Sequence, residues 1–369
     1  DINAIQIAVC EALKEVVSID VETHFTYKGA VELLSGHRYP NAEWTLVHIA
    51  AFENIPETIL SLVTGHNLPV DVLDLNGNSP LIIATQCQNM DAMHALLMVG
   101  AAVNLKSAVD GRTALHYAAN KIGVGNSCKM IQILLDAGAD VNALDDINET
   151  PLHESCFVGN AQDAVCLLLQ YGAKVDTKNN DGDTPLHFAC NQGYNIAVAA
   201  MLINLGASPY VVNESNDSPF HLAYDAVDED YADKMVRMIH EYFPGIDMSF
   251  QDDDGNTMLH KTGYNATFFE WLTGVGACIS RVNDEGNTPL HALADYNHAF
   301  EHTERGMQVR NCIRILLSMN APLDAQNKEG LTPSNIATRA GRHDIAVLLD
   351  TEVCKPKSLH RKSKTFLGR

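Results

Sequence analysis

Apolar residues recur along most of the chain at helical spacing, in short segments separated by residues that favour turns. Ile131, Leu134 and Leu135 form one such stripe, and Gly138 follows it. A second stripe contains Val165, Leu168 and Leu169. Because residues three and four positions apart lie on the same face of a helix, this pattern predicts short amphipathic helices, each ended by a residue that tolerates positive φ.

A motif of Thr, Pro, Leu and His marks the start of a repeating unit. Identical copies occupy residues 150–153, 184–187 and 288–291. Looser copies begin at Thr45, Ser79, Thr113, Ser218, Thr257 and Thr332. The intervals between the nine starting residues are 34, 34, 37, 34, 34, 39, 31 and 44. Thr or Ser suits a helix N-cap and Pro suits the first helical position, so a first helix is predicted to begin at each copy.

A turn is predicted before every motif and another after the second helix of every unit. Two residues before the Thr or Ser stand Gly77, Gly111, Asn148, Gly182, Asn216, Gly255, Gly286 and Gly330, whereas Glu43 occupies this place in the first unit. The second helices are predicted to end at Gly100, Gly138, Gly172, Gly206, Gly245, Gly276 and Asn320. Gly and Asn tolerate positive φ, which tight turns and helix C-termini require.

Each unit therefore reads as turn, helix, turn, helix, with an apolar face that only a neighbouring unit can bury. The period and the Thr-Pro-Leu-His motif resemble the ankyrin repeat. The resemblance implies an all-α ankyrin-repeat solenoid of stacked helix-turn-helix units with β-turn or hairpin loops. It covers residues 38–354, with about nine repeats. Residues 1–37 are expected to form a helical cap or a degenerate repeat, and residues 355–369 a basic tail or linker.

Three intervals are longer than the period and carry extra residues. These are residues 123–127, the acidic stretch 225–233, and residues around 298–306. Insertions into repeat arrays usually lengthen loops on one face, so we expect three enlarged loops.

Composition and charge narrow the classes of function. The chain has 369 residues, of which 46% are hydrophobic, and this content can form a buried core. The net charge is −21, although six of the 25 basic residues lie in the last fifteen positions. A body this acidic repels a phosphate backbone, which argues against nucleic-acid binding by the folded part. No apolar run is long enough to span a bilayer, so we expect a cytoplasmic protein, with the nucleus left open. The sequence begins with Asp1 and not with methionine, so the expected location concerns these residues alone.

The titratable residues do not form a recognisable catalytic or metal motif. Nine cysteines without a Cys-x-x-Cys pair indicate reduced thiols. The motif histidines, at 48, 116, 153, 187, 221, 260 and 291, resemble the family's structural histidine, which hydrogen-bonds to the neighbouring turn. Residues 250–261 resemble a calcium loop but begin with Phe250 and end with Lys261. We expect no catalysis, no metal and no cofactor.

The resemblance also indicates where recognition residues lie: at the turn tips and on two positions of the first helix. For the five units that begin at residues 150, 184, 218, 257 and 288, these 25 positions hold twelve acids and no base. The acids are Asp146, Glu149, Asp181, Asp183, Glu214, Asp217, Asp225, Asp253, Asp254, Asp284, Glu285 and Asp295. Phe157, Tyr264 and Tyr296 share the same face and are expected to act as apolar anchors.

We therefore expect an adaptor that binds a basic protein segment along a concave acidic face. The alternative is the regulatory ankyrin domain of a larger enzyme, channel or ubiquitin-ligase scaffold. Asn142 resembles the asparagine that a hydroxylase modifies in such repeats. The tail has several interpretations: a linker, a contact with anionic lipid or nucleic acid, a pseudo-substrate for the acidic face, or the start of a suppressor-of-cytokine-signalling box, in which Ser363 replaces the expected cysteine.

Overall fold

A computed structural model describes residues 44–120, 126–158, 161–191, 195–224, 229–252, 254–263, 265–295 and 303–353. The expected N-terminal cap (1–37) and basic tail (355–369) lie outside these residues, and so do the limits expected for the array at 38 and 354. The chain divides into two compact units, Asp1–Tyr242 and Phe243–Arg369.

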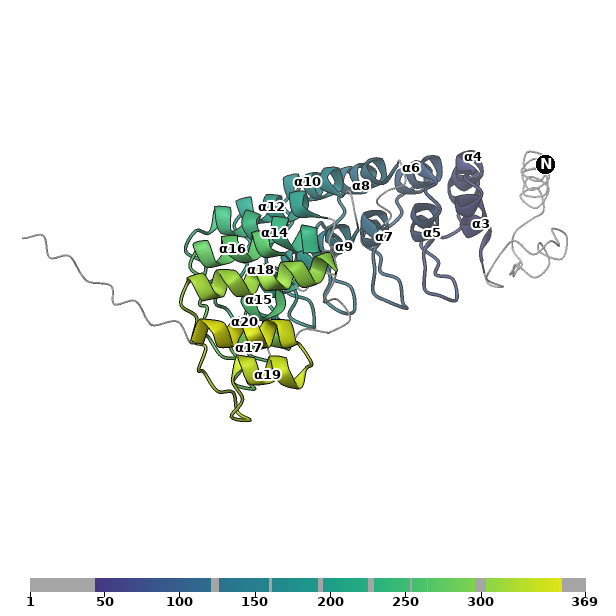
Figure 1. Cartoon of the computed structure of the whole chain (residues 1–369). Coiled ribbons are helices and arrows are strands. Elements are labelled where there is room, and N and C mark those ends of the chain that lie inside the picture. The colour runs from purple at the N-terminus through teal and green to yellow at the C-terminus, as the bar shows by residue number, and fades with distance from the viewer. Residues whose placement is uncertain are drawn as a thin grey trace, which may run out of the picture. The chain divides into compact units, whose positions relative to one another are not determined.

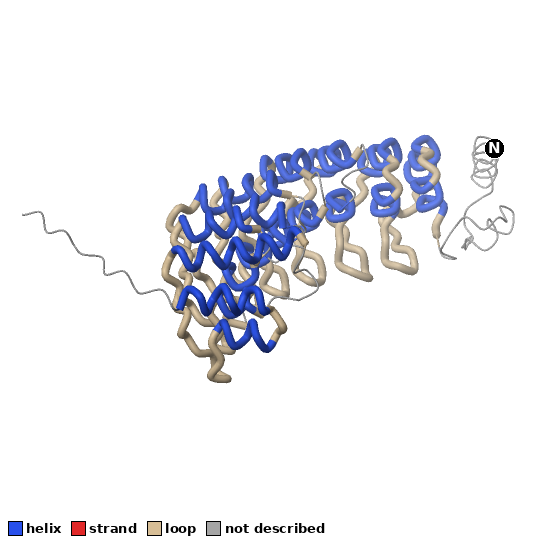
Figure 2. Tube along the Cα trace, viewed as in Figure 1, coloured by secondary structure: helices blue, strands red, loops and turns tan. Residues whose placement is uncertain are grey.

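The first unit is built from short helices in two layers. It contains α3 (Leu46–Phe52), α4 (Pro56–Leu60) with a π-helical turn (Ser61–Gly65), α5 (Pro80–Gln86), α6 (Met90–Met98), α7 (Ala114–Asn120), α8 (Ser127–Asp136), α9 (Pro151–Phe157), α10 (Gln162–Gln170), α11 (Pro185–Asn191), α12 (Ile196–Asn204), α13 (Pro219–Tyr224) and α14 (Glu229–Tyr242). The layer of α3, α5, α7 and α9 lies beside the layer of α4, α6, α8 and α10 (Figure 1). The loops that precede α5 and α7 project away from both layers (Figure 2).

The second unit repeats the same arrangement. It contains α15 (Met258–Lys261), α16 (Ala266–Gly274), α17 (Pro289–Ala294), α18 (Glu304–Ser318), α19 (Pro333–Arg339) and α20 (His343–Val353). Helix α17 packs between α15 and α19, and α16 packs against α18. Within the described ranges of both units every regular element is helical, which confirms the expected all-α repeat fold.

The first helix of a unit begins as the motif predicts. Thr150 is an N-cap with extended backbone, its hydroxyl accepts the N–H of His153, and Pro151 occupies the first helical position. The His153 ring accepts the Thr150 N–H in return, at 3.1 Å. Both ends of this reciprocal cap satisfy backbone donors that a helix terminus leaves without an intrahelical partner. We call the Thr or Ser at this place the anchor of its repeat.

The same histidine joins each repeat to the next. His153 Nε2 lies 3.2 Å from the carbonyl oxygen of Asp183, the residue before the next anchor. Since Nδ1 accepts from the backbone, Nε2 carries the proton and donates it. The equivalent bonds are made by His48, His116, His187, His260 and His291. The structural role expected for these histidines is confirmed at these six positions, and it leaves their rings engaged on both sides.

At the turn before Ser79, glycine is needed for two reasons. Gly77 has φ of 69°, a conformation that side chains with a Cβ rarely adopt. A Cβ on Gly77 would also lie 2.2 Å from the Cβ of Ala108, which belongs to the turn of the following unit. Positive φ occurs at all eight Gly and Asn positions predicted for these turns.

The predicted apolar stripes form the core between the layers. Ile131, Leu134 and Leu135 of α8 are buried. Val165 and Leu168 of α10 are buried as well, whereas Leu169 is only partly covered. Burying an aliphatic side chain stabilises a protein by roughly 1.5 to 3 kcal/mol, and each stripe is buried against a neighbouring helix pair.

Two expectations from the sequence are wrong. The extra residues in the two longest intervals do not simply enlarge loops, because residues 229–233 lie in the 14-residue helix α14 and residues 304–306 in the 15-residue helix α18. Gly245 is not a positive-φ helix stop. Helix α14 instead ends at Tyr242, shortly before Pro244, and proline disfavours helical backbone in the residue before it. The first insertion, 123–127, lies mostly outside the described residues.

None of the described helices combines the length and apolar character that crossing a membrane requires.

Candidate interaction surface

The turns before the anchors form a continuous ribbon within each unit of the fold. We call the four residues before an anchor the tip of that repeat. The Asp146 N–H donates to the Asp110 carbonyl of the preceding tip at 3.1 Å, and the Asn180 N–H donates to Ile147 at 2.9 Å. The Glu214 N–H continues the series to Asp181 at 2.8 Å. One backbone bond per step fixes the spacing of the tips.

Three of the expected acids on the first unit occupy exposed tip positions. Asp146, Asp181 and Glu214 are exposed and lie three or four residues before an anchor. They belong to consecutive repeats that the backbone bonds above join directly. Because repeats stack at about the 8 to 10 Å spacing of packed helices, these carboxylates form a row that raises the local concentration of cations and basic groups.

The acids directly before an anchor are less accessible. Asp183 is half-buried, accepts a hydrogen bond from Asn213 Nδ2 at 2.8 Å, and lies 4.0 Å from His187 Nε2. Asp217 is half-buried in the same way, 3.9 Å from His221 Nδ1. Their position explains this, because the carbonyl of the residue before the anchor accepts the histidine bond and is therefore held against the preceding repeat.

Glu149 is buried, although it was expected at the surface. It belongs to a cluster with Asp145, Glu154 and Arg112, in which the three carboxylates lie within 4.8 Å of one another. Arg112 Nε lies 3.4 Å from Asp145, and Arg112 Nη2 lies 3.7 Å from Glu149 and also pairs with Glu154. Asp145 additionally accepts the Glu149 N–H at 2.8 Å.

This cluster holds three acids and one base, and the pKa values of two of the acids are raised. Burial, reinforced by the neighbouring Glu154, raises the pKa of Glu149 to about 7. Burial also raises the pKa of Glu154, although its side chain accepts a hydrogen bond from Asn120. The Arg112 guanidinium lies among the carboxylates where a metal ion would have to sit, so the cluster is best described as a buried charge network.

Sequence reasoning missed this network. Arg112 stands directly before its anchor, at the position of Glu149 one repeat later. Opposite charges at the same place of consecutive repeats are the signal that could have revealed it.

The second unit presents its own acidic residues. Asp254, Asp284, Glu285 and Asp295 are exposed. The Asp284 N–H donates to the Asp254 carbonyl at 3.0 Å, which joins these two tips as in the first unit. The expected residues Asp225, Asp253, Tyr264 and Tyr296 lie outside the described residues.

Phe157 is the one expected aromatic anchor that the structure describes. It is 50% exposed at the end of α9. Its ring contacts Phe188 edge-on at 6.3 Å between centroids, and Phe188 in turn contacts His153 at 5.4 Å. The contacts hold the ring in place while one side stays open to a partner.

Asn142 joins two neighbouring repeats through its side chain. Its Nδ2 donates to the Gly172 carbonyl at 3.1 Å, and its Oδ1 accepts the Lys174 N–H at 2.8 Å. Asn104 makes the equivalent pair of bonds to Gly138 and Asp140 one repeat earlier. Asn142 thus has a structural role that the sequence comparison did not suggest.

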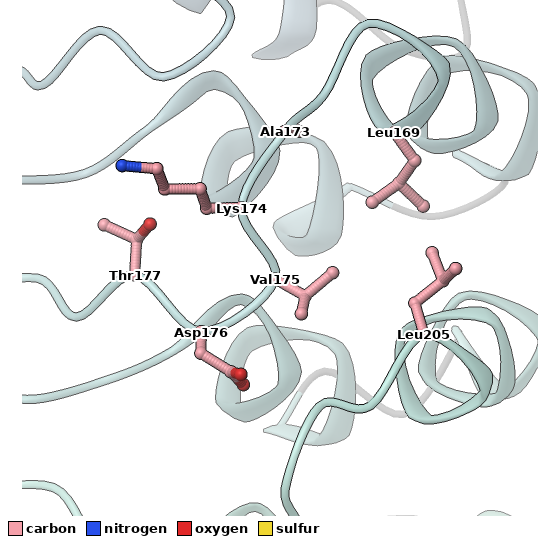
Figure 3. A pocket seen from close by; sticks show the side chains of 7 residues that line it. All are labelled: Leu169, Ala173, Lys174, Val175, Asp176, Thr177 and Leu205. Atoms are coloured by element: carbon pink, nitrogen blue, oxygen red, sulfur yellow. The ribbon is translucent and has the colours of Figure 1, made fainter.

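An open groove lies beside this bridge, where α10 and the end of α12 flank the loop between them. Figure 3 shows Leu169, Val175 and Leu205 converging from three segments, with Lys174, Asp176 and Thr177 along the loop. The groove is wide open to solvent, so it offers little that would enclose and orient a small ligand.

The buried thiols of Cys156 and Cys190 are expected to be unreactive. Burial raises the pKa of Cys156 and of Cys190 well above the ordinary thiol value. Both are fully buried first-helix residues and carry no charge at neutral pH. This agrees with the expectation of reduced, structural cysteines.

Comparison with known proteins places this architecture in a family. A family model for ankyrin repeats in three copies matches residues 46–145, 92–179, 125–213 and 152–236, and a model for the single ankyrin repeat matches residues 285–328.

Among curated relatives, a putative ankyrin repeat protein of fowlpox virus (strain NVSL) is 30% identical over 26% of this chain and 21% of its own length. The B-cell lymphoma 3 protein of Homo sapiens is 32% identical over 29% of this chain and 23% of its own length. A probable serine/threonine-protein kinase of Dictyostelium discoideum is 32% identical over 28% of this chain and 12% of its own length. The chain thus spans less than a quarter of each of these relatives. Since the repeat model covers more than half of the sequence, the chain belongs to the ankyrin-repeat family, whose repeats generally act as protein–protein interaction modules.

Proposed function

We propose that this protein is a non-catalytic adaptor that binds a basic segment of a partner protein along its acidic tips. The observation that carries the proposal is the row of Asp146, Asp181 and Glu214 on consecutive repeats, exposed and joined by backbone bonds. Such a row attracts Lys and Arg side chains at long range, and the attraction weakens as salt screens it. The second unit offers a comparable set in Asp254, Asp284 and Glu285.

The described chemistry favours binding over catalysis. The motif histidines are the most numerous candidate bases, and at six of their positions the backbone engages both ring nitrogens, as it does at His153. The buried carboxylates already share Arg112. We further propose a cytoplasmic or nuclear location and a protein partner. The acidic surface argues against nucleic acid on the folded body. For the basic tail, residues 355–369, the proposed role is that of a linker.

The test is the affinity of the full chain for a fluorescent nona-lysine peptide, measured by anisotropy. The double variant Asp181→Lys/Glu214→Lys is compared with Asp176→Lys/Glu241→Lys, which changes the charge equally at exposed positions outside the tips. We expect the tip variant to lose about tenfold in affinity and the control to change by much less, because only the former alters groups in direct contact with the peptide. Equal losses in both variants would show that net charge, and not the tips, governs binding.

The alternative is that the repeats regulate a larger enzyme. Its support is that the matched segment forms 12% of a probable serine/threonine-protein kinase. An antibody against the repeats distinguishes the two proposals, because the alternative predicts a native polypeptide much larger than 40.3 kDa with an associated activity.

Hydroxylation of Asn142 remains a separate proposal. The bonds to Gly172 and Lys174 use the side-chain amide and leave the Cβ hydrogens as the reactive position. Intact and peptide mass spectrometry of protein isolated from cells tests it: one added oxygen on the peptide that contains Asn142 supports the proposal, and an unmodified peptide contradicts it.

A further inference from the structure

Three consecutive tips of the first unit carry exposed apolar side chains. Leu75 is 61% exposed, Val109 69% and Ile147 47%. They stand three or four residues before the anchors Ser79, Thr113 and Thr150. The Ala108 N–H donates to the Gly77 carbonyl and the Asp146 N–H to the Asp110 carbonyl, so these three tips are adjacent.

The next two tips carry polar residues three and four positions before their anchors. Asp181 and Glu214 are exposed there, and the Asn180 N–H joins their ribbon to Ile147 at 2.9 Å. Asp146 lies beside Ile147 at the change from apolar to acidic. The surface thus has a direction, with its apolar part toward the N-terminus of the unit and its acidic part after it.

This row differs from the scattered apolar residues that any protein surface carries. Single exposed aliphatic side chains are common, but exposed ones on the tips of three successive repeats form a patch, and apolar patches with a polar border mark binding sites. At the stacking distance of helices, three tips span roughly 20 Å.

We propose that the tips from Leu75 to Glu214 bind one partner segment in a single orientation, with an apolar block over Leu75, Val109 and Ile147 and a basic block over Asp181 and Glu214. Charge complementarity selects the basic block, since the tips at 180–183 and 214–217 carry acids and no base. Removal of apolar surface from water stabilises the contact between the apolar block and Leu75, Val109 and Ile147, and it fixes the position of the segment along the tips. The inference rests on the proposed function and specifies the partner: a segment whose apolar and basic residues are separated, and not a uniformly basic one.

Two peptides of identical composition test the inference. One has Leu and Val residues in a block followed by Lys residues, synthesised in both chain directions, and its isomer has the same residues interspersed. We expect the better block peptide to bind the full chain about tenfold more tightly than the isomer, because only the block places apolar groups over all three tips. The variant Leu75→Ser/Val109→Ser should remove this preference and leave the affinity for the isomer unchanged.

The control variant is Met98→Ser/Leu205→Ser. It removes two other exposed apolar side chains, at the C-terminal ends of α6 and α12. We expect it to retain the full preference for the block peptide. Circular dichroism of all variants confirms that each remains folded, since exposed residues contribute little to the core.

Each other outcome overturns the inference in a recognisable way. Equal affinity for block and isomer, together with no effect of Leu75→Ser/Val109→Ser, contradicts the directional surface while leaving the basic-partner proposal intact. Indifference of both peptides to Asp181→Lys/Glu214→Lys contradicts the proposed function itself. Tighter peptide binding after removal of residues 355–369 shows that the chain's own tail is the occupant. A dimer that Leu75→Ser/Val109→Ser converts to a monomer in sedimentation shows that a second copy is the occupant.

Discussion

The Nε2 atom of His116 lies 3.1 Å from the carbonyl oxygen of Glu149, one repeat further along the chain. The side chain of the same Glu149 lies in the buried cluster with Arg112. One residue therefore connects two stabilising systems, the backbone bonds that join the repeats and the charge network beneath the tips. Both systems involve titratable groups, so the stability of the array depends on pH in ways that single substitutions can separate.

Loss of a motif histidine should destabilise the array. His153→Ala removes the acceptor for the Thr150 N–H and the donor to the Asp183 carbonyl. The buried Thr150 N–H and the part-buried Asp183 carbonyl then lack these partners, so we expect a loss of about 2 to 4 kcal/mol in the free energy of unfolding. Urea unfolding followed by circular dichroism measures it. His94→Ala, at an exposed position of α6, is the matched control and should change stability by less than about 0.5 kcal/mol.

Acid should destabilise the protein as these histidines protonate. Burial lowers the pKa of His153 to about 4 in the folded state, against 6.5 for the ordinary side chain. The unfolded chain therefore binds the proton first as pH falls. The stability due to neutral His153 is present above pH 6.5 and is lost as pH falls toward 4, by roughly 2 to 3 kcal/mol.

The chain contains its own control for this pH dependence. In the last repeat Asn335 stands in place of the histidine, and its Oδ1 accepts the Thr332 N–H at 3.2 Å. His153→Asn should keep this cap and remove the titration. We expect urea unfolding of the variant to lose less stability between neutral and acidic pH than the parent, and an equal loss would contradict the role assigned to His153.

Neutralising Glu149 should stabilise the protein at neutral and higher pH. Its folded pKa of about 7 exceeds the ordinary 4.5, so its contribution to stability is present below 4.5 and is lost as pH rises to 7. Glu149→Gln keeps the contact with Asn179 without the charge. With allowance for solvent screening, we expect a gain of about 1 to 2 kcal/mol that grows between these two pH values and is constant above them. Thermal unfolding across this range measures it, and Glu57→Gln at an exposed site should show no such gain.

The close approach of neighbouring tips can be measured with two glycines. Gly77 and Gly100 both have positive φ, but a Cβ on Gly77 meets Ala108 at 2.2 Å, whereas a Cβ on Gly100 meets nothing within 4 Å. Gly100→Ala should cost about 1 to 2 kcal/mol, the strain of left-handed backbone alone. Gly77→Ala should cost more, because the ribbon of tips must shift as well. Equal costs by urea unfolding would show that the tips do not approach as described.

Much of this fold follows from local patterns in the sequence. The anchors with their prolines, and the Gly or Asn two residues before them, specify the helix starts and the turns directly, and the structure shows positive φ at every such turn. Helix lengths are harder to predict, because the extra residues, some of which lie in α14 and α18, are compatible with either a loop or additional helical turns. Gly245 was misassigned because Pro244 already ends the helix nearby.

The burial of Glu149 could not be read from its own repeat. Its environment depends on Arg112 in the preceding repeat and on Asn179 in the following one. The exposed positions three and four residues before an anchor differ from the position directly before it, which the histidine bond holds against its neighbour. This distinction separates Asp181 and Glu214, which face solvent, from Asp183 and Asp217, which are partly covered.

The most direct test of recognition by the tips is photo-cross-linking of the full chain to the nona-lysine peptide. A photoreactive phenylalanine replaces Ser215, an exposed tip residue, or Asp176, an exposed residue outside the tips. We predict a cross-link at position 215 that disappears at high salt and in the Asp181→Lys variant, with little reaction at position 176. Equal cross-linking at both positions, or a reaction at 215 that neither salt nor Asp181→Lys reduces, would contradict binding along the acidic tips.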